Sequence, residues 1–155
     1  MGRFDSCLFD CGFAIGSTSY EDHYPGDEEQ NRIVLSVAPE NNKEATTEMI
    51  VDTGAPWCIL HPELNETWGL KSESHDPGVP LRIRGQKWFG HLIRANMALL
   101  AINGKDLLIE ATFFVPLIQP GNTWNYPNFI GLDGFLNRIL FAVDPSEKVF
   151  YFGAL

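Results

Sequence analysis

The sequence contains few basic residues, and they are not clustered. Of its 155 residues, 11 are Lys or Arg and 20 are Asp or Glu, which gives a net charge of −9. Because nucleic-acid binding through phosphates needs clustered Lys and Arg, we expect no nucleic-acid partner. No apolar run approaches the ~20 residues of a membrane span, so we also expect no membrane partner. The first residues lack a basic stretch followed by an apolar one, which favours a cytoplasmic location.

Cysteine is scarce as well, with Cys7, Cys11 and Cys58 as its three occurrences. An odd number of cysteines cannot all pair within one chain, which argues against a disulfide scaffold and for a reducing compartment. The spacing of Cys58 and His61 would suit a metal ion, but a structural zinc site usually has two such pairs. Cys58 also lies in a hydrophobic stretch, where cysteine behaves as a small apolar side chain. We therefore expect no metal and no cofactor.

The motifs of the common nucleophilic hydrolases are missing too. A serine or cysteine hydrolase needs a nucleophile together with a histidine and an orienting acid. The sequence has no Gly-x-Ser-x-Gly and no cysteine motif of that kind. This class of enzyme is therefore disfavoured.

Turn-forming residues and short apolar segments are what the sequence does have. It contains 14 Gly and 10 Pro, and its 45% hydrophobic content is enough for a buried core. Segments rich in β-branched or alternating apolar residues recur at 33–37, 46–51, 81–84, 91–95, 97–102, 106–115, 139–143 and 148–152. We expect Gly85–Gly90 to form the tip of one hairpin and Asn103-Gly104 the turn of another. The sequence therefore predicts an all-β fold, with a short helical turn or loop at 61–69 and a short helical segment at 133–138.

The composition changes about thirty residues into the chain. Residues 1–30 hold an apolar patch followed by a polar, acidic stretch, whereas strand-like segments begin just after them. We therefore predict an N-terminal arm at 1–30 and one domain at 31–155. The length suits a single lobe rather than two.

One segment, Met49–Ala55, combines residues that can do chemistry. The apolar strand before Asp52 would deliver this carboxyl group to the floor of a cleft, and Gly54 and Ala55 would let a substrate approach closely. The hydroxyl group of Thr53 can hydrogen-bond to a neighbouring backbone and fix the loop. Hydrolysis of a peptide bond by water needs both a base and an acid, and two carboxyl groups that share one proton supply both. An Asp before Gly also commonly caps a turn, which is the structural alternative.

The sequence resembles the retropepsin-like aspartic proteases, single-lobed relatives of pepsin, in three segments that follow in the family's order. The first is Asp52-Thr53-Gly54-Ala55 after its apolar strand. The second is the hairpin 83–93, which lies where the family has its flap. The third is Phe129-Ile130-Gly131 with the short helical segment after it. Together these segments extend over about residues 32–141.

This resemblance implies a closed, single-lobed β-barrel with one short helix near its C-terminus. It also implies a homodimer, with one Asp52 from each subunit, that cleaves extended peptide or protein substrates. The site residues it implies are Asp52 as the catalytic residue, Thr53, Gly54 and Ala55 as the active-site loop, Gly85, Gln86, Lys87, Trp88, Phe89 and Gly90 as the flap, and Ile130 and Gly131 as the pocket wall. At the expected tip, Trp88 and Phe89 would either close over a bound peptide or pack on a neighbouring segment.

Several positions depart from the family pattern. Viral members often have an acidic residue after the Ala and an Arg after the later Gly, which form an ion pair near the dimer interface, but here these positions are Pro56 and Leu132. Cys58 stands where Ser or Thr is frequent. The closing hairpin 139–152 is longer than in the compact viral form, so it would supply the dimer sheet or shield an edge of the lobe. These departures keep a second hypothesis open, a catalytically silent retropepsin-like module for dimerisation or peptide binding.

Overall fold

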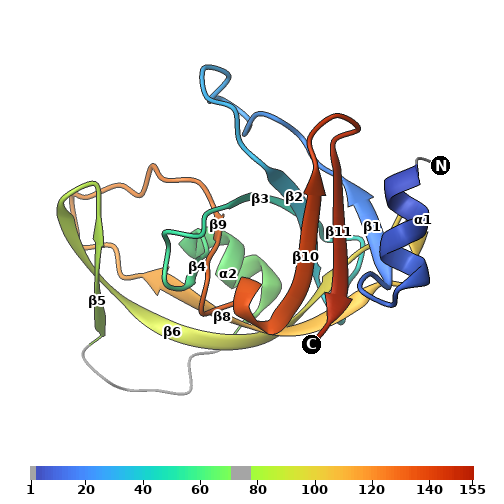
Figure 1. Ribbon diagram of the computed structural model, residues 1–155. Coiled ribbons are helices and arrows are strands. Elements are labelled where there is room, and N and C mark those ends of the chain that lie inside the picture. Colours follow the sequence, from blue (N-terminus) through green and yellow to red (C-terminus); the bar gives the residue numbers. More distant parts are fainter. Residues whose placement is uncertain (1–2, 71–77) are drawn as a thin grey trace.

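The molecule is built around a closed β-barrel (Figure 1). The computed structural model describes residues 3–70 and 78–155. Among these residues, six strands form the barrel in the order β2-β3-β9-β4-β8-β6, and a second pairing of β6 with β2 closes the ring. The bounds are β2 Val34–Pro39, β3 Thr47–Val51, β4 Cys58–Ile59, β6 Gln86–Leu99, β8 Leu107–Pro116 and β9 Phe129–Ile130, with β5, Val79–Ile83, attached to the edge of β6. The prediction of a closed, all-β lobe is confirmed.

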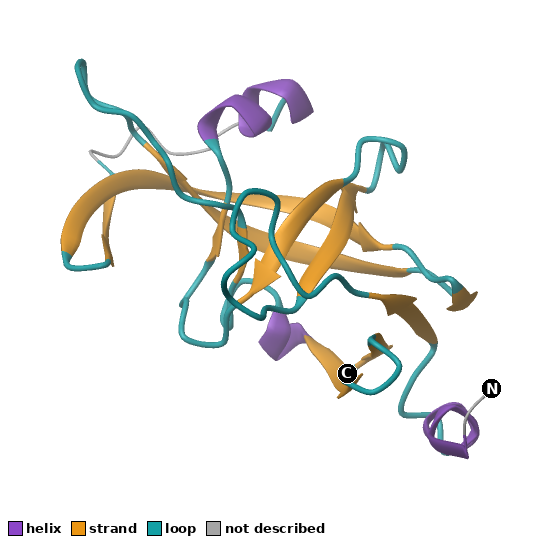
Figure 2. Ribbon diagram, turned by 90° about the horizontal axis from the view of Figure 1, so that it is seen from above, coloured by secondary structure: helices purple, strands orange, loops and turns teal. Residues whose placement is uncertain are grey.

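A second, smaller sheet joins the two ends of the chain. In the described part of the chain it has four strands in the order β10-β11-β1-β7. Their bounds are β1 Gly16–Ser19, β7 Asn103–Gly104, β10 Ile139–Asp144 and β11 Val149–Ala154. Strand β1, which lies within the predicted arm, thus pairs with the closing hairpin. Helix α1, Arg3–Asp10, lies at the outer end of this sheet beside the N-terminus (Figure 2).

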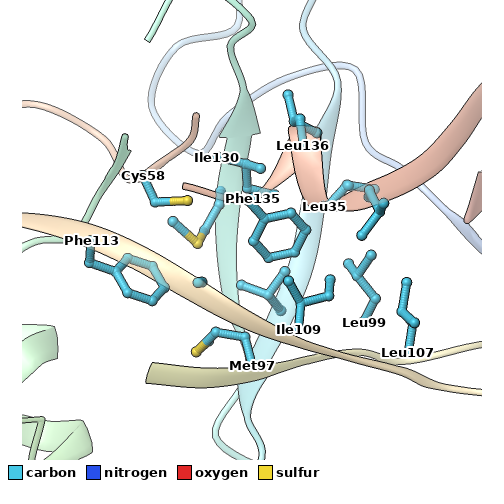
Figure 3. Packing of buried hydrophobic residues seen from close by; sticks show 14 of the residues in the cluster. Leu35, Cys58, Met97, Leu99, Leu107, Ile109, Phe113, Ile130, Phe135 and Leu136 are labelled. Atoms are coloured by element: carbon cyan, nitrogen blue, oxygen red, sulfur yellow. The ribbon is translucent and has the colours of Figure 1, made fainter. Parts of the chain in front are cut away.

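The barrel interior is filled by apolar side chains from nearly every strand. Figure 3 shows Leu35, Ile109 and Ile130 around Phe135, which follows β9. Phe135 and Leu136 are each 1% exposed, so the segment after β9 is anchored in the core. The short 3₁₀ helix η1, Leu136–Arg138, follows directly. The sequence predicted this helical segment, although the helix itself is shorter than the range 133–138.

The other helix near the core, α2 at Pro62–Trp68, lies within the predicted segment 61–69. His61 Nδ1 accepts a hydrogen bond from the Glu63 backbone N–H at 3.3 Å, and Pro62 occupies the first turn, where it is well tolerated. Gly69 ends the helix in the left-handed conformation, with φ of 65°. No helix within residues 3–70 and 78–155 has the length and apolar character needed to span a membrane.

The predicted hairpin tip at Gly85–Gly90 is wrong, because the turn is only two residues long. Arg84 and Gly85 both have positive φ, 49° and 82°, as in the type I′ turns that close tight hairpins. Ile83 pairs with Gln86 across this turn, so Gln86–Gly90 belongs to β6. Gly90 is not a turn residue. A Cβ atom there would lie 2.5 Å from the Val115 carbonyl oxygen, so this glycine permits close strand packing.

The Asn103-Gly104 pair is likewise not a hairpin turn. The hairpin of β6 and β8 exists, as predicted, but its last pair is Leu99 with Leu107, and a longer connection follows. Within that connection Asn103-Gly104 forms β7 and pairs with β1. A Cβ atom at Gly104 would collide with the Ile15 carbonyl oxygen, so the glycine serves the contact between the barrel and the second sheet.

Candidate active site

The loop that carries Asp52 leaves the end of β3 and returns to the barrel as β4. Strand β9 lies between these two strands, parallel to β3 and antiparallel to β4. The Asp52 backbone N–H donates to the Ile130 carbonyl oxygen at 3.0 Å, which continues the pairing of β3 with β9 up to the catalytic candidate. The barrel therefore fixes the position of this aspartate from both sides.

Within the loop, the Asp52 carboxyl group is held by one of its two oxygens. The Gly54 N–H donates to Asp52 Oδ1 at 2.9 Å, and the Ala55 N–H donates to the Asp52 carbonyl oxygen at 3.1 Å. Within residues 3–70 and 78–155, Oδ2 has no hydrogen-bond partner. The side chain of Asp52 is half-buried, so this free oxygen is available to a ligand or to another carboxyl group.

The segment after β9 supports the loop from below. The Leu132 N–H donates to the Ala55 carbonyl oxygen at 2.7 Å, and the Asp133 N–H donates to the Pro56 carbonyl oxygen at 2.7 Å. Gly131 packs so closely that a Cβ atom there would collide with the Trp57 carbonyl and lie 2.9 Å from the Ala55 carbonyl oxygen. Two of the three segments that the sequence singled out are thus in direct contact.

A cleft of about 300 Å³ opens over Asp52. Its described walls come from the Asp52 loop, from β4 and β9, from the hairpin of β5 and from the segment before β2: Arg32, Asp52, Gly54, Ala55, Pro56, Ile59, Leu81, Arg82, Ile83, Arg84 and Phe129. The lining residues place the cleft between the Asp52 loop and the β5 side of the hairpin. Among its described walls, this cleft contains one carboxyl group, that of Asp52.

The sequence-predicted site residues are distributed unevenly around this cleft. Asp52, Gly54 and Ala55 line it, whereas Thr53 is exposed beside it. Residues 85–90 of the predicted flap, which are the turn residue Gly85 and the start of β6, are not among the residues that line the cleft. Leu81, Arg82 and Ile83 of β5 and the turn residue Arg84 line it instead. Ile130 is fully buried in the barrel core, and Phe129 before it faces the cleft.

The arginines at 32, 82 and 84 and the apolar residues Leu81 and Ile83 are site residues that the sequence reasoning did not identify. The alternation of Leu81, Arg82 and Ile83 indicated a strand, but successive residues of a strand face opposite sides, so this pattern did not place all three at one cleft. Arg32 gave no signal, since it reaches the cleft only through the folding of the barrel.

An aromatic cluster holds the hairpin in place. Trp88 contacts Trp124 and Tyr126 edge to face, with ring centroids 5.0 Å and 5.9 Å apart. Trp88 is 7% exposed, whereas its neighbour Phe89 is 44% exposed and has Lys87 Nζ 4.9 Å from its ring centroid. Of the two alternatives for these aromatic residues, Trp88 packs on a neighbouring segment, and Phe89 points to the surface.

No protein-family model and no curated protein sequence matches this chain. A solved structure does: the crystal structure of a retropepsin-like aspartic protease from Rickettsia conorii, with a TM-score of 0.50 and 17% identity, over 90% of this chain and 94% of that one. This chain has the retropepsin-like fold. The retroviral protease-like domain of Ddi1 from Leishmania major also aligns, with a TM-score of 0.48 and 15% identity, over 80% of this chain and 94% of that one.

Cys58, which begins β4 after the Asp52 loop, is fully buried. Burial raises the pKa of its thiol from 9.0 to about 12, although a hydrogen bond with the Gly131 backbone and the charge of Arg138 act in the opposite direction. Cys58 is therefore a neutral, unreactive thiol at physiological pH. Among the described residues, no group of three or more His, Cys, Asp or Glu side chains is placed to hold a metal ion.

Alkylation with iodoacetamide at pH 8 should distinguish the cysteines. Cys7 and Cys11 are exposed and should react, whereas Cys58 should stay unmodified because its thiol is buried and protonated. Mass spectrometry of the intact protein should show two adducts in the folded state and three after denaturation in guanidinium chloride. Modification of Cys58 in the folded protein at the rate of the other two would contradict this account of its environment.

Proposed function

We propose that this chain is an aspartic endopeptidase that acts as a homodimer on extended polypeptide substrates. The observation that carries the proposal is the position of Asp52, half-buried at the floor of a cleft and held by a loop between β3, β9 and β4. Among the described residues that line this cleft, Asp52 is the only acidic one. The retropepsin-like fold supports this choice of reaction.

The requirement for a second carboxyl group is the reason to propose a dimer. One carboxylate can take a proton from water but cannot also donate one to the peptide carbonyl, so the cleft of one chain is chemically incomplete. The residues that surround Asp52 leave room for a second copy, because Thr53, Gly54 and Pro56 are exposed. Leu132, beside this loop, is 42% exposed although it is apolar.

In the proposed reaction, a water molecule lies between the two Asp52 carboxyl groups, one ionised and one protonated. The ionised group takes a proton from the water as the water oxygen bonds to the carbonyl carbon of the peptide. The protonated group gives its proton to the carbonyl oxygen. The tetrahedral intermediate then collapses: the C–N bond breaks as the Asp52 that took the proton from water gives it to the leaving nitrogen, and the other Asp52 takes a proton from a hydroxyl group of the intermediate as the new carboxyl group forms. No cofactor is required.

The hairpin provides a surface to which an extended peptide can pair. Strand β5 is an edge strand among the described residues. The pair Ile83 and Gln86 closes the two-residue turn with hydrogen bonds, and successive pairs alternate, so the backbone polar groups of Arg82 point away from β6. Addition of a strand at such an edge gives affinity through main-chain hydrogen bonds, which suits a substrate cut along its backbone.

The test is to incubate the purified chain with a denatured protein and with a peptide library between pH 4 and pH 7, and to identify products by mass spectrometry. We expect internal cleavage that is blocked by a peptide mimic of the tetrahedral intermediate, and sedimentation should give the mass of a dimer. A monomer that cleaves would contradict the dimer. An intact dimer without cleavage would favour the silent module, which the loss of the ion-pair positions at Pro56 and Leu132 supports.

A further inference from the structure

Positive charge is concentrated at the cleft of an otherwise acidic chain. The sequence has 11 basic residues against 20 acidic ones. Of these, Arg32, Arg82 and Arg84 line the cleft over Asp52, and within the described walls Asp52 is the only opposing charge. A cleft lined with one sign of charge attracts ligands of the opposite sign, even when the net charge of the whole protein would repel them.

These arginines have little internal compensation. Among the described residues, Arg82 and Arg84 take part in no ion pair, and Arg32 has only Asp27, at 4.0 Å. The Nε–H of Arg32 is buried and has no acceptor among the described residues. A buried donor without an acceptor is unfavourable, and a ligand carboxylate would supply the missing partner.

The hairpin keeps like charges together at a position where they repel. Arg82 and Lys87 are directly opposite each other in the pairing of β5 with β6. Like charges opposite each other destabilise an antiparallel pair, and no acidic side chain among the described residues neutralises them. An anionic ligand over the hairpin would relieve this repulsion.

Arg84 occupies a turn position that disfavours its side chain. Its φ of 49° is in the left-handed region, where type I′ turns usually have Asn, Asp or Gly. A strained residue at a candidate site is a reason to look for a role beyond the turn itself. Since Arg84 lines the cleft, that role is contact with the molecule that occupies the cleft.

The apolar residues of the cleft indicate what else the ligand contains besides its negative charge. The apolar residues Ile59, Leu81, Ile83 and Phe129 line the cleft together with the arginines. The occupant therefore needs an apolar side chain close to carboxylates, which Arg binds with paired hydrogen bonds. A nucleic acid fits poorly, because three arginines are too few to bind a phosphate backbone to a chain of net charge −9.

We propose that the cleft over Asp52 selects acidic polypeptides, in which Asp or Glu residues flank an apolar residue and contact Arg32, Arg82 and Arg84. The claim that acidic polypeptides are the preferred substrates rests on the proposed function. The claim that they bind more tightly than neutral ones does not. The contacts are local, since charges separated by more than about 10 Å are screened at 0.1 M salt.

The test measures binding separately from hydrolysis. The probes are two fluorescein-labelled octapeptides with the same apolar centre, one flanked by glutamates and the other by glutamines. Their affinities for the full chain carrying Asp52→Asn are measured by fluorescence anisotropy at pH 6.5, where glutamate is ionised. We expect the glutamate peptide to bind about tenfold more tightly at low salt, because several partly exposed ion pairs add together.

Two variants locate the preference. Arg82→Gln with Arg84→Asn should remove it, and the fold should be retained because Asn suits the left-handed turn position. Arg94→Gln with Lys105→Gln removes the same charge from exposed positions outside the cleft and should keep the preference. Equal binding of the two peptides, no binding of either, or equal loss in both variants would each overturn the proposal.

Hydrolysis by the unmodified chain distinguishes this inference from the proposed function. Cleavage of both peptides at equal kcat/KM would support the protease and overturn the acidic preference. Tighter binding of the glutamate peptide through the hairpin arginines, with no cleavage of either peptide, would support the acidic preference and contradict the protease.

Discussion

Replacement of Asp52 by Asn should reduce kcat/KM for peptide hydrolysis by at least about 10³-fold, because in a homodimer it removes both the base and the acid. The amide cannot take a proton from water, and no other acidic residue of the described cleft walls is placed to do so. Asn keeps an oxygen that can accept from the Gly54 N–H, so the loop should retain its shape. Steady-state kinetics with a cleaved library peptide would measure the loss.

Asp144→Asn is the matched control for this experiment. Asp144 Oδ1 accepts a hydrogen bond from the Ser146 N–H at 2.9 Å, the same two-residue contact at the same distance as that of Asp52 with Gly54. Asp144 ends strand β10, in the second sheet, and takes no part in the described cleft. The control should therefore keep its activity. If Asp52→Asn remained fully active, Asp52 would be only a turn-capping residue, and the proposed function would be lost.

Gly131→Ala should destabilise the chain by about 3 kcal/mol or more and abolish activity with it. The new methyl group would enter the Trp57 carbonyl and approach the Ala55 carbonyl oxygen. Both are backbone groups in a loop that is held by the hydrogen bond from Leu132 to Ala55, so relief of the overlap requires movement of the Asp52 loop itself. The midpoint of urea unfolding would measure this loss of stability.

Gly121→Ala provides the comparison. Gly121 has a left-handed backbone conformation, with φ of 85°, and no atom lies within 4 Å of the position of its Cβ. Its replacement should cost about 1 kcal/mol from backbone strain alone. A similar loss for the two variants would show that the close contact at Gly131 does not determine the stability of the loop.

The barrel strands and the Asp52 loop were predictable because they depend on local pattern. Alternating and β-branched residues give the strands, and an aspartate after an apolar strand marks the loop. The hairpin was predicted less well, since a glycine signals both a turn and a close contact between strands. Gly85 is a turn residue, whereas Gly90 permits a close contact between strands. Only the position of Val115 across the sheet distinguishes the role of Gly90 from that of Gly85.

The composition of the cleft was the least predictable part of the site. Arg32 lies twenty residues before Asp52 in the sequence and reaches the same cleft because β2 and β3 pair as neighbours. Trp88 is buried against Trp124 from a distant loop, so its location depends on a contact that no local pattern encodes. Such long-range contacts decide which side chains meet a substrate.

The pairing of β1 with β11 has a consequence for the order in which the molecule assembles on the ribosome. Every barrel strand has been synthesised by Ile130, whereas Gly16 has to wait for Phe152 before the small sheet can form. A nascent chain can thus build its barrel and its Asp52 loop while its first strand is still unpaired. The small sheet, which joins residues far apart in this sequence, is therefore completed after the barrel.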